Sequence, residues 1–184
     1  MHIFPKPGYK NSEKALEILK EAIKKYDVKE VVVASTHGTT GLQAAKALKG
    51  FGTKVIVVTH NVGFKEPGTL EMKPETRKEI ESLGGVVYTG TMPFRNIGTA
   101  IRSTLGYSQQ DLIANTLRLL CQGIKVCVEI VMMAADAGLI GTEDVLAMAG
   151  TARGADTVAL IKPASSNNLF KIKIRDILAK PFDW

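Results

Sequence analysis

Residues 35–41 form a short segment whose composition suits the binding of an anion. Six of its seven positions are Ser, Thr or Gly, and the seventh is His37. In order they are Ser35, Thr36, His37, Gly38, Thr39, Thr40 and Gly41. Hydroxyls donate hydrogen bonds to phosphate oxygens, and glycine lets the backbone approach a ligand closely. The same residue types also cap helices and shape turns, so composition leaves both interpretations open.

The elements on either side of this segment favour the phosphate interpretation. Before it, residues 31–34 form a short, continuous, mostly β-branched run, typical of a strand buried on both faces. After it, Leu42, Ala45 and Leu48 recur with the spacing of one helix face. A strand, a turn and a helix N-terminus together present free backbone N–H groups and the positive end of the helix dipole. The segment is neither a Walker A loop nor a GxGxxG fingerprint.

Three later loops are expected to meet at the same edge of the sheet, because each follows a predicted strand. The strands are predicted at 54–59, 86–88 and 145–149. The loops add candidate contacts for a polar or anionic ligand: Asn61, Gly63, Phe64, Thr91, Arg95, Gly150, Thr151 and Arg153. Phe64 and Phe94 could flank a flat ring. Each of these residues can equally shape a turn or form a surface ion pair.

His37 and His60 are the candidate acid–base groups, because histidine titrates near neutral pH. The sequence assigns no Ser/His/Asp or Cys/His arrangement and no cluster with metal-ligand spacing, so we expect no metal site. Glu129 and Asp136 lie seven residues apart, and we interpret them as part of a solvated helix face. Cys121 and Cys127 lie in an apolar stretch and are predicted to be small core residues.

Helices and strands alternate regularly in the first half of the chain. Ser12 is predicted to cap a helix that runs to Tyr26, and Pro74 to begin one that runs to Leu83. Alternation of this kind indicates βαβ crossovers and a parallel sheet.

The second half of the chain is less regular. Ser108 and Asp111 resemble a capping box that begins a long helix to Leu120, and residues 124–137 favour a helix. Strands are predicted at 157–161 and, as an edge strand, at 171–174. No linker or repeat interrupts the chain, so residues 1–184 are predicted to form one domain.

Composition narrows the choice of partners. The net charge of +6 is spread among acidic residues, and no basic stripe interleaved with aromatics is present, so nucleic acid is not an expected partner. The apolar stretch 124–140 contains charged residues and is too short to span a membrane, so we expect no membrane partner. The N-terminal residues lack a signal-peptide pattern, and we expect a cytoplasmic protein. The stretch 124–140 could supply the face of a homo-oligomer.

Two segments resemble the C-terminal domain of pyruvate kinases: the VVVASTHGTTGLQAAKAL run followed by KVIVVTHN, and the later EDVLAMAGTARGADTVALIKP. The whole chain resembles more closely a family of small, stand-alone, largely archaeal proteins similar to that domain. The resemblance implies a three-layer α/β/α fold with a mostly parallel sheet of about five strands. It also implies that residues 35–40 contact a phosphate, as the matching turn does in allosteric pyruvate kinases.

The resemblance does not imply pyruvate kinase activity. The catalytic groups of those enzymes lie in a separate barrel of roughly two hundred residues or more, for which this chain has no room. We therefore expect a protein that binds a phosphorylated small molecule: flavin mononucleotide (FMN), another nucleotide or a sugar phosphate. The alternative is an enzyme that uses such a ligand as substrate or cofactor, helped by His37 or His60.

Overall fold

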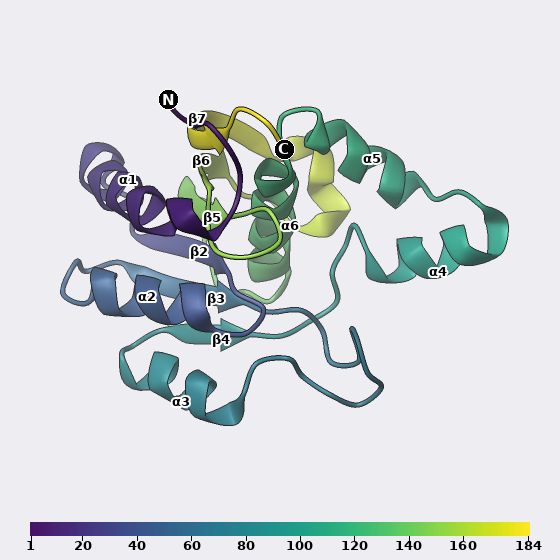
Figure 1. The fold of residues 1–184 in the computed structure, drawn as a ribbon, viewed down its shortest axis with the longest axis horizontal. Helices are drawn as coiled ribbons and strands as arrows, with labels where there is room; N and C mark the ends of the chain where they lie inside the picture. The colour runs from purple at the N-terminus through teal and green to yellow at the C-terminus, as the bar shows by residue number, and fades with distance from the viewer.

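The computed structural model describes residues 1–184, and all of its strands lie in one sheet (Figure 1). The strands are β1 His2–Phe4, β2 Glu30–Ala34, β3 Lys54–Val58, β4 Val86–Tyr88, β5 Val145–Ala149, β6 Thr157–Lys162 and β7 Lys173–Pro181. Their order is β1-β7-β6-β5-β2-β3-β4. The pairs β1·β7, β2·β3, β2·β5 and β3·β4 are parallel, whereas β5·β6 and β6·β7 are antiparallel. The mostly parallel α/β fold is thus confirmed, but the sheet has seven strands and not about five.

Helices cover both faces of the sheet. They are α1 Ser12–Tyr26, α2 Thr39–Leu48, α3 Pro74–Ser82, α4 Asn96–Leu105, α5 Gln109–Arg118 and α6 Gln122–Asp136. Short 3-10 helices occupy Tyr9–Asn11 and Ser166–Lys171. α1, α2 and α3 lie on one face, α6 lies on the other with α5 packed beside it, and α4 extends away from the sheet (Figure 1).

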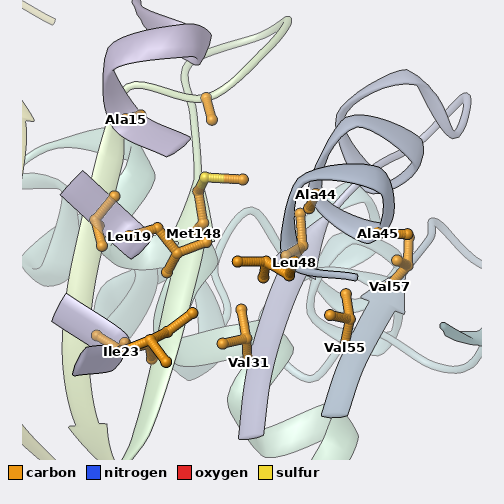
Figure 2. Packing of buried hydrophobic residues seen from close by; sticks show 14 of the residues in the cluster. Ala15, Leu19, Ile23, Val31, Ala44, Ala45, Leu48, Val55, Val57 and Met148 are labelled. Atoms are coloured by element: carbon orange, nitrogen blue, oxygen red, sulfur yellow. The ribbon is translucent and has the colours of Figure 1, made fainter. Parts of the chain in front are cut away.

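The central strands place alternate side chains in two separate cores. Val31 and Val33 of β2 pack under α1 and α2, whereas Val32 faces α6. Figure 2 shows the first core, in which Leu19 of α1 and Leu48 of α2 pack together with Val31 of β2 and Met148 of β5. Because both faces are buried, β2 and β3 are apolar at every position after their first residues, Glu30 and Lys54, as the sequence indicates.

Several predicted boundaries need correction. Of the strand predicted at 171–174, only Lys173 and Ile174 are extended, and Lys171 ends the preceding 3-10 helix. These two residues begin the longer β7, which lies between β1 and β6 and is therefore not at an edge. β1 forms that edge instead, and its three residues are too few to show a periodic pattern. Ser12 does not cap α1, because its Oγ accepts a hydrogen bond from Ala155 N at 2.9 Å. Ser108 does cap α5 by accepting from Asp111 N, but the helix ends at Arg118.

Helix α6 is buried, contrary to two expectations from the sequence. Glu129 is only 3% exposed and does not belong to a solvated face, whereas Asp136 is exposed. The apolar side chains of α6 fill the second core, so this stretch cannot supply the exposed face of a homo-oligomer. Cys121 and Cys127 are buried and free, as predicted. None of the helices has the length and apolar character needed to cross a membrane.

Candidate functional site

The turn between β2 and α2 is held from within by Ser35. The backbone N–H of Ser35 donates to Val58 O on β3 at 2.9 Å, which continues the parallel ladder one residue beyond the strand. Its side chain accepts from Gly41 N at 3.0 Å, so Ser35 itself closes the turn. Ser35 is buried, whereas Thr36, His37 and Thr39 are partly or fully exposed. The hydroxyl of Ser35 is therefore structural, and the exposed part of the turn is left for a ligand.

The backbone N–H groups of residues 36–40 donate no hydrogen bond within the chain. Helix α2 begins at Thr39, and its first intrahelical bond runs from Leu42 N to Gly38 O. Unpaired N–H groups at a helix N-terminus attract anions, because the partial positive charge of the helix is concentrated there. The turn thus presents a row of free donors together with the Thr36 and Thr39 hydroxyls.

Two glycines make this turn sterically feasible. Gly38 has a φ of 95°, which side chains rarely adopt, and a Cβ there would lie 2.3 Å from Thr76 Cγ2 of α3. A Cβ at Gly41 would lie 2.5 Å from Val57 Cγ1 of β3. The glycines therefore let α2 sit close to β3 and α3, which fixes where the free N–H groups point.

We expect Gly41→Ala to destabilise the protein by about 1–3 kcal/mol, because the added methyl overlaps a buried valine. Urea denaturation followed by circular dichroism measures this change. Gly141→Ala is the matched control, since its Cβ would meet nothing closer than Glu30 Oε2 at 3.9 Å and its φ is not positive. Equal stability of the two variants would show that Gly41 does not set the position of the turn.

A cleft of about 1080 Å³ opens beside the turn. Its walls come from the ends of β2 and β3, the loops after β3, β4 and β5, the start of α2 and one side of α6. Nine of the predicted site residues line it: Ser35, Thr36, His37, Thr39, Thr40, Phe64, Arg95, Gly150 and Arg153. The carboxyl ends of β2, β3, β4 and β5 therefore meet at one edge, as their parallel pairing requires.

The other predicted residues do not line the cleft: Gly38, Gly41, Asn61, Gly63, Thr91 and Thr151. Gly38 and Gly41 act through the backbone, as described above. Asn61 accepts a hydrogen bond from Asn96 Nδ2 at 2.8 Å and so ties two loops together. Thr151 N donates to the buried Asp156 carboxylate at 3.0 Å, which anchors the loop after β5.

Phe64 packs against two other flat side chains, His60 and Arg95, on one wall of the cleft. Its ring centroid lies 4.0 Å from that of His60, and the Arg95 guanidinium lies 4.7 Å from it. Phe94 does not join this wall, because it is buried beneath it in the second core. Of the two phenylalanines, only Phe64 therefore lines the cleft.

A buried ion pair that the sequence pattern did not indicate lies on the α6 side of the cleft. Lys125 and Glu129, at 4% and 3% exposure, are hydrogen-bonded to each other and both line the cleft. Glu129 also accepts from Phe94 N at 2.9 Å. Burial lowers the pKa of Lys125, and the Glu129 carboxylate only partly offsets this. In the sequence, only the i, i+4 spacing of Lys125 and Glu129 indicates an ion pair, and this spacing is also common on solvated helices.

A second polar array connects the turn to the loop after β3. Thr36 Oγ1 lies 3.3 Å from His60 Nε2, and His60 Nδ1 lies 2.7 Å from Glu71 Oε2. Lys65 lies 2.9 Å from the other oxygen of Glu71. Burial alone would raise the pKa of Glu71, but Lys65 and His60 outweigh it, so the pKa of this carboxyl lies below its usual range. The structure thus brings together a hydroxyl, a histidine and a carboxylate that the sequence did not assign.

His37 does not belong to the array of Thr36, His60 and Glu71. Its ring is exposed, and Nδ1 lies 3.3 Å from the backbone oxygen of Glu71. No group of three or more His, Cys, Asp or Glu side chains is arranged to hold a metal ion. The polar chemistry of the cleft therefore comes from the turn, from the two arrays just described and from Arg95 and Arg153.

No family model matches the chain. Among solved structures, it is similar to a pyruvate kinase from Cryptosporidium parvum at 16% identity and a TM-score of 0.44, over 87% of this chain and 24% of that chain. It is also similar to O-ureido-L-serine synthase at 20% identity and a TM-score of 0.33, over 61% of this chain and 30% of that chain. The chain thus spans less than a third of the length of either protein. These scores describe a partial likeness of fold, and the chemistry of the cleft follows from its own residues.

Proposed function

We propose that the protein binds a phosphorylated small molecule in the cleft, with the phosphate at residues 36–40. The observation that carries this proposal is the row of backbone N–H groups without internal partners at the start of α2. An unsatisfied N–H is costly where it is shielded from water, and a phosphate oxygen satisfies it well. The hydroxyl of Thr39, whose side chain is exposed and lines the cleft, adds a further donor.

The rest of the cleft suits a ligand with an organic part beyond its phosphate. A volume of about 1080 Å³ is far larger than a phosphate needs and accommodates a nucleotide. Phe64 offers a flat apolar surface, and Arg95 and Arg153 offer positive charge to further anionic or polar groups. FMN, another nucleotide and a sugar phosphate all fit this description, and Phe64 favours a ligand with a ring.

We also propose that the chain belongs with the pyruvate kinase C-terminal-like domains. This rests on the resemblance of residues 31–59 and 144–174 to that domain. The phosphate-binding turn of those proteins corresponds to the turn described here, and the two arguments support the same site. Self-association and a cytoplasmic location are further proposals.

We expect the freshly purified protein to release a phosphorylated compound on denaturation, because the free N–H groups gain their partners from it. Mass spectrometry of the released material identifies the compound, and an absorbance spectrum of the intact protein shows whether it is a flavin. Release of FMN would identify the ligand as a flavin nucleotide. If nothing is released, titration calorimetry with FMN, AMP and ribose 5-phosphate distinguishes weak binding from none. No binding of any phosphorylated compound, inorganic phosphate included, would contradict the proposal.

An enzyme that uses this ligand is the second candidate. The observation that favours it is the Thr36–His60–Glu71 array, because a histidine held by a carboxylate is a common proton-transfer group.

A further inference from the structure

We propose that Thr36 accepts a phosphoryl group from a compound bound in the cleft, with His60 as the general base and Glu71 as the residue that positions His60. This inference rests on the proposed function, because the phosphate must first bind at the turn. It adds an activity: phosphoryl transfer from an acyl or aryl phosphate, followed by hydrolysis of the phosphothreonine.

The hydrogen bonds determine the direction of proton transfer. The ionised Glu71 carboxylate can only accept, so at 2.7 Å the Nδ1 atom of His60 is the donor. Neutral His60 then carries no proton on Nε2, which is free to accept one from the Thr36 hydroxyl at 3.3 Å. This is the arrangement that activates a hydroxyl as a nucleophile in enzymes with a Ser/His/carboxylate triad.

Glu71 is held firmly enough for its role. Its side chain is 10% exposed, and it lies between His60 and Lys65, with Lys65 Nζ at 2.9 Å. The His60 ring also packs on Phe64, with the centroids 4.0 Å apart. The imidazole is therefore fixed both by its hydrogen bond to Glu71 and by an aromatic contact, and its Nε2 faces Thr36 in the turn.

The nucleophile lies within the anion site itself. Thr36 is the first residue of the row of free N–H groups at 36–40. N–H groups that hold the oxygens of a phosphate also stabilise the negative charge that those oxygens carry during transfer. The Thr36 side chain is partly exposed and lines the cleft, so a bound phosphorus atom is accessible to it.

The reaction has two steps, transfer of the phosphoryl group to Thr36 and its hydrolysis by water. Thr36 Oγ1 forms a bond to phosphorus, the bond from phosphorus to the leaving oxygen breaks, and the hydroxyl proton moves to His60 Nε2. Water then attacks the phosphothreonine, the Oγ1–phosphorus bond breaks, and His60 returns the proton to Oγ1. One proton of the water is lost to solvent, and the other leaves with the inorganic phosphate.

The leaving group must be weakly basic. In phosphoryl transfer the attacking and leaving oxygens lie roughly in line, so a base beside the nucleophile cannot protonate the oxygen on the opposite side. The carboxylate of an acyl phosphate and the phenolate of an aryl phosphate leave without a proton. These are therefore the phosphoryl donors that the arrangement favours.

The test uses the full chain with 4-nitrophenyl phosphate and acetyl phosphate as donors. We expect steady release of 4-nitrophenolate, and acid-quenched samples should contain a peptide in which Thr36 carries one phosphoryl group. Thr36→Val should abolish both signals, whereas Thr36→Ser should keep them. His60→Gln should lower the rate by about 10²–10⁴-fold. Glu71→Gln should lower kcat by a smaller factor and leave KM unchanged, because Glu71 does not touch the phosphate.

His2→Gln is the matched control, since His2 lies on β1 outside the cleft and its loss should not alter the rate. Calorimetric titration of each variant with inorganic phosphate separates the two proposals. Phosphate binding by the wild type without turnover and without labelled Thr36 would overturn the phosphoryl-transfer proposal and leave the binding function intact. Labelling of a different residue would also overturn it. Absence of phosphate binding by the wild type would overturn both the binding function and the phosphoryl-transfer proposal.

Discussion

Thr39→Glu is expected to abolish binding of phosphorylated ligands while the protein stays folded. Thr39 is the first residue of α2, and its side chain is exposed at the cleft. A carboxylate there would occupy the free N–H groups of the turn itself and would repel the anion that they otherwise bind. We expect affinity for inorganic phosphate to fall by about 100-fold or more, which corresponds to about 2.7 kcal/mol or more.

Isothermal titration calorimetry with inorganic phosphate measures this loss, and circular dichroism checks the fold. Gln109→Glu is the matched control, because Gln109 is the exposed first residue of α5 and receives the same charge in the same helical position. Unchanged phosphate affinity in Thr39→Glu, with wild-type affinity in the control, would show that the turn is not the phosphate site.

The second large effect is expected at the buried ion pair of α6. Glu129→Ala leaves the Lys125 ammonium in the protein interior without its counter-ion and deprives Phe94 N of its acceptor. Removing one partner of a buried pair typically costs about 3–5 kcal/mol, because the remaining charge stays desolvated. We expect a loss of this size in the free energy of unfolding, measured by urea denaturation.

The double variant Lys125→Met/Glu129→Gln distinguishes this cause from a general packing defect. The glutamine oxygen still accepts from Phe94 N, and methionine fills the volume of the lysine stem without a charge. We expect its stability to lie within about 1–2 kcal/mol of wild type, since both desolvation costs disappear together. A double variant as unstable as Glu129→Ala would show that the charges themselves are not responsible.

The sequence predicted the parts of the fold that depend on local pattern. Residues 31–34 and 54–58 are apolar at nearly every position because helices cover both faces of the sheet, and this pattern identifies them as buried strands. β1 and α4 were missed. The three residues of β1 show no period, and they pair with β7 near the other end of the chain, which local pattern cannot reveal.

For the candidate site too, the sequence predicted the parts that depend on local pattern and not those that depend on tertiary contacts. The turn at 35–41 was visible because one segment supplies its residues, and the loops that meet it follow from parallel strand pairing. The polar arrays were not predictable, since the contacts that define them are tertiary. Glu71 lies eleven residues after His60 in a loop without periodicity, and only the folded loop brings the two within 2.7 Å. Glu129 has the spacing of a solvated helix pair, and only the burial of α6 shows otherwise.

The most direct test of phosphate binding at the turn is a ¹H–¹⁵N correlation spectrum recorded during titration with inorganic phosphate. The backbone N–H groups of residues 36–40 have no partner within the chain, so their proton signals should move downfield as phosphate oxygens accept from them. The shifts should saturate together with a single dissociation constant and should be absent in Thr39→Glu. Saturable shifts that instead appear elsewhere, with residues 36–40 unmoved, would contradict the assignment of the phosphate site.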